Sequence, residues 1–125
     1  MLRKIRGFTL IELLVVVALI GVLSAIGVTY YSGFKESSER KQAETTMQSI
    51  YLAQQEYKSN NGSVLISSNT NAIVQNLFDG VDDLTEQTYT FTIVGNASAG
   101  TFCIRATKTG QSTLYLNNLK KKTNC

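Results

Sequence analysis

Arg3-Lys4-Ile5-Arg6-Gly7-Phe8-Thr9-Leu10-Ile11-Glu12 is the stretch that decides how this chain folds, because it opens an apolar segment that runs to Phe34. Glu12 is the only charged side chain between Phe8 and Phe34. About 20 apolar residues suffice for a helix to cross a bilayer, and cations at its start are typical of a membrane-flanking segment. We therefore expect a membrane helix in which Glu12 has a compensating partner, since an ionised side chain in hydrocarbon costs roughly 2 to 3 kcal/mol.

The residues before Phe8 form a short basic leader that ends in glycine. In an ordinary secretory signal the apolar region precedes the cleavage site and is discarded with it. Cleavage between Gly7 and Phe8 would instead keep the apolar segment on the mature chain. We predict that residues 1–7 are a removable leader and that the retained helix has a role of its own.

The run Gly7-Phe8-Thr9-Leu10-Ile11-Glu12-Leu13, followed by the apolar residues 14–28, resembles the start of the type IV pilins and their relatives. The resemblance implies that a prepilin peptidase cuts after Gly7 and methylates the new amino group of Phe8. It also implies that Glu12 pairs with the terminal amine of a neighbouring subunit in a filament, where an unpaired charge would be costly. The alternative is a tolerated carboxylate near the lipid head groups.

Glycines interrupt the apolar segment at Gly21, Gly27 and Gly33, and each weakens a helix by roughly 0.5 to 1 kcal/mol relative to alanine. By resemblance, the helix loosens around here when it packs into a filament, usually between a glycine and a proline. Gly21 matches that glycine, but Thr29 stands where many relatives have proline, and this chain contains none. Close packing of small residues between helices is the alternative interpretation.

From Lys35 the pattern becomes amphipathic, with charges on one side and a buried stripe predicted on the other. Asn60-Asn61-Gly62 predicts the end of the helix, which we expect to run from Phe8 to Ser59. Residues 8–34 are thus the predicted transmembrane or filament-core helix, and residues 35–125 the globular head with the amphipathic half of the helix. The predicted buried stripe comprises Ala43, Met47, Ile50, Gln54 and Tyr57.

The sequence of the rest of the head predicts a polar connection followed by three strands. The apolar group within residues 72–78 predicts a helical turn or short helix, and alternation over Thr88–Val94 predicts the clearest strand. Turns then lead into predicted strands at Thr101–Thr107 and Ser112–Asn117. We therefore expect an α+β fold, by resemblance the type IV pilin fold: a long N-terminal helix packed on a small antiparallel sheet of three to four strands.

Cys103 and Cys125 are the only cysteines, and a disulfide between them is the economical interpretation. It would stabilise the head by roughly 3 kcal/mol in the chain-entropy estimate if the head is delivered to an oxidising compartment. The resemblance agrees, because pilins often close a carboxy-terminal region in this way. A zinc site is disfavoured because the chain has no histidine.

Composition argues against an enzyme. The absence of histidine excludes histidine-based acid–base and nucleophilic catalysis, and neither a phosphate-binding loop nor a dinucleotide motif is present. We therefore predict no catalytic residue, no cofactor and no metal. The acidic residues between Asp79 and Glu86 are interpreted as a solvated loop, although calcium is an alternative ligand for them.

The formal charge of +3 is misleading, because Arg3, Lys4 and Arg6 of the leader account for all of it. A basic end remains on the mature chain, and it has three interpretations: a solvated tail, a DNA-binding surface, or a contact with the acidic block of a neighbouring subunit. The candidate ligand- or DNA-contacting residues are Arg105, Lys108, Lys120, Lys121 and Lys122.

Together these features predict a non-enzymatic structural subunit that waits in the bacterial inner membrane and is polymerised by pilus assembly proteins into a homo-oligomeric surface filament. Such a filament would serve adhesion, motility or DNA uptake. One alternative is a minor pilin that binds DNA or a surface, and another is a pseudopilin of type II secretion. The disulfide counts against the pseudopilin. A membrane-anchored protein that forms no filament is the weakest alternative.

Overall fold

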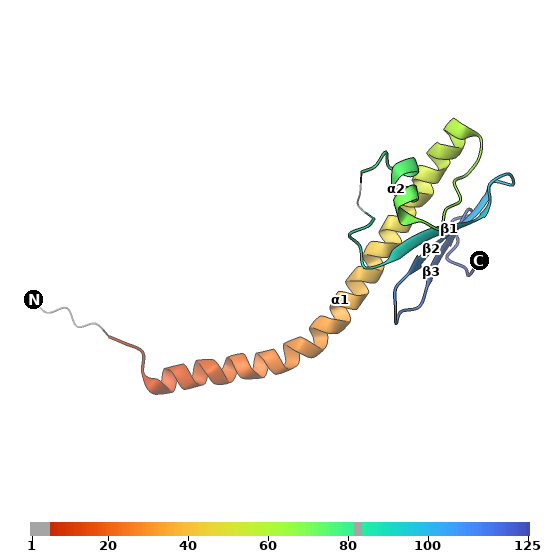
Figure 1. The fold of residues 1–125 in the computed structure, drawn as a ribbon. Coiled ribbons are helices and arrows are strands. Elements are labelled where there is room, and N and C mark those ends of the chain that lie inside the picture. The colour runs from red at the N-terminus through yellow and green to blue at the C-terminus, as the bar shows by residue number, and fades with distance from the viewer. Residues whose placement is uncertain (1–5, 82–83) are drawn as a thin grey trace, which may run out of the picture. The chain divides into compact units, whose positions relative to one another are not determined.

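The computed structural model describes residues 6–81 and 84–125 (Figure 1). Within them the chain forms helix α1 (Leu10–Asn61), helix α2 (Thr70–Leu77) and strands β1 (Thr90–Asn96), β2 (Thr101–Thr107) and β3 (Leu114–Asn117). This confirms the predicted α+β fold with a long N-terminal helix and a small antiparallel sheet. The chain divides into two compact units, Met1–Ser37 and Ser38–Cys125, and we call the second unit the head.

Helix α1 is bounded by the residues that normally begin and end a helix. It starts after Thr9, and it ends where the Gly62 amide donates to the Lys58 carbonyl at 2.8 Å with a φ of +77° at Gly62. Helix α2 begins after Asn69, whose side-chain oxygen accepts from the Asn71 amide at 2.9 Å. Helix α1 thus begins and ends two residues later than predicted, and α2 begins two residues before the predicted apolar group.

The head is built around a three-stranded sheet whose order is β1-β2-β3, all antiparallel. Ile93, Ile104 and Leu116 lie directly opposite one another across the three strands and are buried. Strand β2 has the predicted bounds, whereas β1 and β3 each begin two residues later than predicted. Their registers place alternate side chains on the face that forms the core.

The predicted stripe of α1 supplies the other side of this core, and Figure 1 shows the second half of α1 beside the sheet and α2. Tyr57 is the exception, because it is only half-buried, whereas Thr46 is buried instead. The Thr46 hydroxyl donates to the Gln42 carbonyl and lies 3.0 Å from the Gln87 side-chain oxygen, so its polar atom is satisfied. The buried residues of α1 are Ala43, Thr46, Met47, Ile50 and Gln54.

Gln54 fastens the connection between the two helices to α1. It is fully buried, and its side chain pairs with both backbone groups of Leu65: Nε2 donates to the carbonyl at 2.6 Å, and Oε1 accepts from the amide at 2.9 Å. Ser67 then exchanges two backbone hydrogen bonds with Ile93 at 3.0 and 2.7 Å. The connection is thus held between α1 and β1.

Replacing Gln54 by methionine should destabilise the head by about 2 to 4 kcal/mol. Methionine is of similar size, but it leaves the partly buried amide and carbonyl of Leu65 without this partner, and each unsatisfied group costs about 1 to 3 kcal/mol. Chemical denaturation of the detergent-solubilised chain, followed by tyrosine fluorescence, measures the change. Gln55→Met, at an exposed position on the same helix, is the matched control; equal stability of the two variants would contradict the pairing.

Candidate functional site

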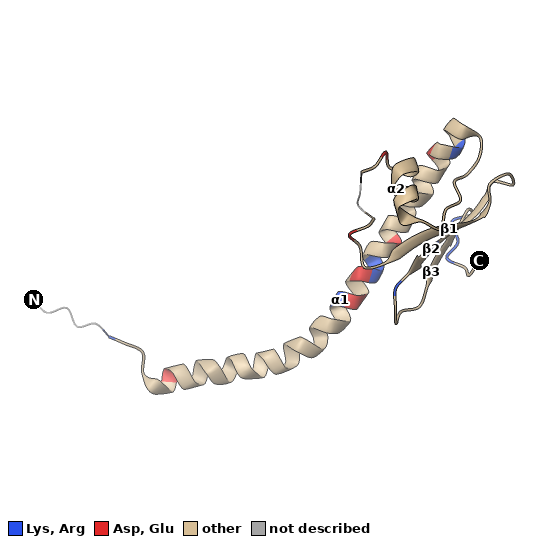
Figure 2. Cartoon of the chain, viewed as in Figure 1, with Lys and Arg blue, Asp and Glu red and all other residues tan. Residues whose placement is uncertain are grey.

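The apolar segment of α1 presents its side chains to the outside in every direction. Each large apolar residue from Phe8 to Phe34 is exposed, and α1 is long and apolar enough to cross a membrane. Glu12 is the single charged residue between Phe8 and Phe34, and Figure 2 shows charged residues gathered further along α1. An exposed apolar surface of this extent marks contact with lipid or with other proteins.

Glu12 has a local partner at the start of this segment. The Thr9 amide donates to Glu12 Oε2 at 2.9 Å, and the Glu12 amide donates to the Thr9 hydroxyl at 3.3 Å. This reciprocal pair is a capping box, and it also places the carboxylate at the positive end of the helix dipole. The sequence signal for this cap is a threonine followed three residues later by glutamate. The cap uses only one of the two Glu12 carboxylate oxygens, Oε2.

The predicted disulfide joins Cys103 to Cys125, with Cα atoms 6.1 Å apart. Cys103 is buried within β2, whereas Cys125 is exposed. Beside the bridge, Arg105 Nη2 donates to the Cys125 carbonyl at 2.5 Å. The tail is therefore held to the sheet by a covalent bond and by a charge-assisted hydrogen bond.

Asn117 organises the beginning of the tail. Its side-chain oxygen accepts from the backbone amides of Leu119 and Lys121 at 3.0 and 2.9 Å. The backbone amide of Asn117 donates to the Lys121 carbonyl at 3.0 Å. Lys120, within this turn, has a φ of +63°. No sequence pattern predicts this role for Asn117, the last residue of β3.

The side chains of four of the five predicted basic contact residues have partners, and these lie at different places on the head. Lys108 forms an ion pair with Glu39, Lys122 pairs with Glu44 at 3.3 Å, and Lys120 Nζ lies 5.6 Å from the centre of the Tyr51 ring. The three partners on α1 are spread over about 18 Å of helix. Arg105 contacts Cys125, as described above, and Lys121 is exposed.

Glu44 is the acid that connects α1 to the tail, with Lys122 and Lys41 at 3.3 and 3.5 Å. Partial burial pushes the pKa of the Glu44 carboxyl upward, but the hydrogen bond and charge of Lys122, aided by Lys41, outweigh it. The pKa therefore lies below its ordinary value.

Acid should remove the contribution of the Glu44 carboxylate to the stability of the head. Because the pKa of Glu44 is lowered on folding, its stabilisation is present above the ordinary pKa near 4.5 and is lost as the pH falls through the folded value. We expect Glu44→Gln to lower stability at neutral pH by less than about 1 kcal/mol, since the pair is partly exposed, and to match the unmodified chain in acid below the folded pKa of Glu44. Denaturation at both pH values measures this, with Glu56→Gln as an exposed control. A loss that persists in acid would contradict it.

The predicted acidic loop is only partly described. Asp82 and Asp83 lie outside the described residues, as do leader residues 1–5. Asp79 and Glu86, at the ends of the loop, are exposed, and Asp79 has a φ of +51°.

Comparison with known proteins connects the N-terminal segment to a family. Residues 2–28 match the model of the prokaryotic N-terminal methylation motif. The chain is 44% identical over 52 residues to the type IV major pilin protein PilA of Myxococcus xanthus, a match that covers 42% of this chain and 24% of that protein. It is 32% identical over 72 residues to a fimbrial protein of Neisseria meningitidis, covering 52% and 42% of the two chains.

A third relative belongs to a secretion system. The chain is 39% identical over 56 residues to type II secretion system core protein G of Pectobacterium carotovorum, covering 45% of this chain and 36% of that protein. In each of these comparisons the match spans less than half of the relative's length. No solved structure matches the chain.

Proposed function

We propose that this chain, which carries the N-terminal motif of the type IV pilins and their relatives, is a structural subunit of a type IV pilus. The observation that supports it most is the exposed apolar helix that follows Gly7-Phe8 and contains only Glu12 as a charge. Such a surface cannot remain in water. It is suited first to a membrane and then to the packed helices of a filament.

In this proposal the N-terminal residues direct processing and assembly. A prepilin peptidase removes residues 1–7 by cleavage between Gly7 and Phe8, and the Phe8 amine is methylated. Residues 8–34 lie in the inner membrane until assembly proteins insert the subunit into a helical homo-oligomer, in which Glu12 pairs with a neighbouring terminal amine. Residues 35–125, with the sheet and the Cys103–Cys125 disulfide, form the outer surface of the filament.

A pseudopilin of type II secretion is the second candidate, because one relative is a core protein of that system. The disulfide still counts against it. A minor pilin is the third candidate, since the N-terminal motif does not distinguish major from minor subunits. Abundance in sheared surface filaments separates the three.

Binding of DNA by the basic residues receives less support than a structural role for them. Lys108, Lys122 and Arg105 contact Glu39, Glu44 and Cys125 within the same head, so three of the five cations are occupied in holding the head together. We propose that their main role is structural. Retention of DNA by sheared filaments, compared between the unmodified chain and Lys121→Glu, tests the alternative at an exposed lysine.

The proposed function is tested on filaments sheared from the cell surface. We expect the chain to be the dominant protein and its first peptide to begin at Phe8 with one additional methyl group, as mass spectrometry would show. A Gly7→Val variant, which blocks cleavage, should stay in the membrane fraction. Absence of the chain from the sheared material together with a secretion defect would point to the pseudopilin, and an unprocessed N-terminus in filaments would contradict the proposal.

A further inference from the structure

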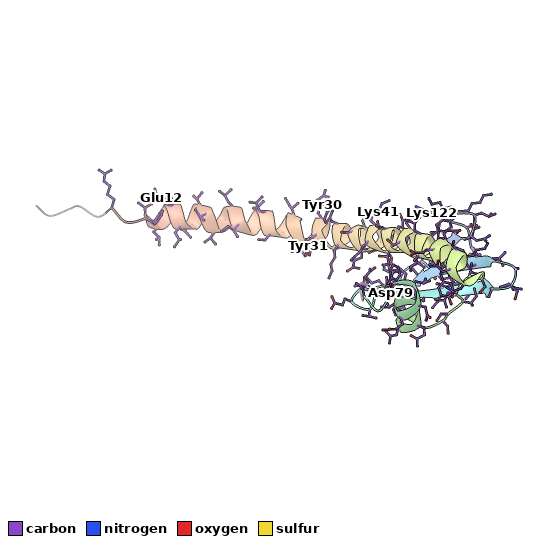
Figure 3. The ribbon with its side chains drawn as sticks, turned by 90° about the horizontal axis from the view of Figure 1, so that it is seen from above. Glu12, Tyr30, Tyr31, Lys41, Asp79 and Lys122 are labelled. Carbon is purple, nitrogen blue, oxygen red and sulfur yellow. A yellow bond between two sulfur atoms is a disulfide. The ribbon has the colours of Figure 1, made fainter. Side chains whose placement is uncertain are left out.

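The apolar segment ends in a group of exposed aromatic side chains. Tyr30, Tyr31 and Phe34 are 77%, 68% and 73% exposed. In Figure 3, Tyr30 and Tyr31 stand out from the helix at the opposite end of the apolar segment from Glu12. At about 100° per residue, the three rings occupy one face about 100° wide, with Phe34 between the two tyrosines. Lys35 and Glu36 follow directly, so this is where the apolar segment meets polar sequence.

The distance between this aromatic group and Glu12 matches the thickness of a membrane. At 1.5 Å per residue, Tyr30 and Tyr31 lie about 27 to 29 Å along the helix from Glu12. The hydrocarbon core of a bilayer is about 30 Å thick. Tyrosine is enriched at the boundary between hydrocarbon and head groups, because its ring is apolar and its hydroxyl is polar. When the rings occupy one boundary, Glu12 therefore reaches the other.

We propose that Tyr30, Tyr31 and Phe34 form an interfacial anchor for the lipid head groups, which sets the depth of the unassembled subunit so that Glu12 lies at the opposite head-group layer. The inference rests on the membrane-anchored state in the proposed function and specifies its geometry. The Glu12 carboxyl is then hydrated on one side and accepts the hydrogen bond from the Thr9 amide on the other. The carboxylate loses its water only when the helix enters a filament.

The charges at the two ends of the segment agree with this placement. Lys35 follows the apolar run directly, so this cation falls within one head-group layer and can contact phosphate. Arg6, two residues before Phe8, can do the same at the other layer until the leader is removed. Glu12 and Tyr30 are separated by about five whole turns and thus lie on one face of the helix. Because they share a face, a change in the tilt of the helix changes the distance of both residues from their membrane boundaries.

The chain contains no tryptophan, so one introduced tryptophan reports depth without interference. Three variants of the full-length chain are inserted separately into vesicles of phosphatidylethanolamine and phosphatidylglycerol: Ile11→Trp, Val22→Trp and Tyr31→Trp. Quenching is compared between lipids brominated near the head group and lipids brominated near the end of the acyl chain. We expect the shallow quencher to be at least about twofold more effective at positions 11 and 31, and the deep quencher at position 22.

Stronger quenching of the tryptophan at position 31 by the deep quencher, or no quenching by either lipid, would overturn the proposed anchor. Deep quenching at position 11 would place Glu12 in hydrocarbon and would overturn its assignment to the head-group layer. In the Ile11→Trp chain, replacing Tyr30, Tyr31 and Phe34 by leucine keeps the segment apolar but removes the anchor, and the shallow preference should fall. An unchanged preference would show that the rings do not set the depth. Because these measurements use unassembled protein, they fail independently of the filament assay.

Discussion

Glu12→Gln is expected to abolish filaments while leaving cleavage after Gly7 and membrane insertion intact. Glutamine keeps the capping box, because its side-chain oxygen can accept from the Thr9 amide as the carboxylate does. It removes the negative charge, so the terminal amine of a neighbouring subunit would be buried without its counter-ion. Breaking a buried ion pair costs about 3 to 5 kcal/mol, which corresponds to a loss of at least about a hundredfold in assembly.

The control for this prediction separates charge from helix capping. Thr9→Val removes the hydroxyl that accepts from the Glu12 amide but keeps the Glu12 side chain, so filaments should persist at near-normal yield. Sheared surface protein measures assembly, and the membrane fraction and the mass of the N-terminal peptide measure insertion and cleavage. Normal filaments from Glu12→Gln together with loss of filaments from Thr9→Val would show that Glu12 acts only as a helix cap.

The elements of this fold could be predicted because their signals are local. The apolar run from Phe8, the stripe that includes Met47 and Ile50, and the alternation around Phe91 each depend on residues close together in sequence. The disulfide could be predicted because two cysteines allow one intramolecular pairing. The ends of the elements were less accurate, because they depend on individual caps such as Asn69.

What the sequence could not predict are partners brought together by the fold. Gln54 falls on the apolar stripe, and nothing near it indicates that its amide pairs with Leu65 across the connection. The partners of the basic residues could not be predicted either, because they too are distant in sequence. Lys108 and Lys122 looked like one cationic end in the sequence, but antiparallel pairing and the path of the tail bring them to Glu39 and Glu44, at different positions along α1. Their charges are therefore assigned by tertiary structure.

Gly95→Ala should be among the most destabilising single changes in the head, at about 3 kcal/mol or more. Gly95 lies in β1 opposite Phe102, with a φ of +147° that side-chain-bearing residues rarely adopt. A Cβ at this position would lie 2.3 Å from the Thr101 carbonyl oxygen and 2.8 Å from the Phe102 Cα. Both atoms belong to backbone, so the overlap can be relieved only by moving β2 away from β1, which disturbs the core that Phe102 and Ile104 form.

Gly110→Ala is the comparison for Gly95→Ala, because it places a side chain at a positive φ without overlap with neighbouring atoms. Gly110 also has a positive φ, +79°, but a Cβ there would meet no atom within 4 Å, so its loss should be limited to about 1 kcal/mol of backbone strain. Denaturation midpoints of both variants and of the unmodified chain provide the comparison. A much larger loss at Gly95 is the result expected from its φ of +147° together with the close approach of the β1 and β2 backbones. Equal losses would mean that β1 can shift to accept a side chain, and that the close approach of the two strands contributes little to the stability of the head.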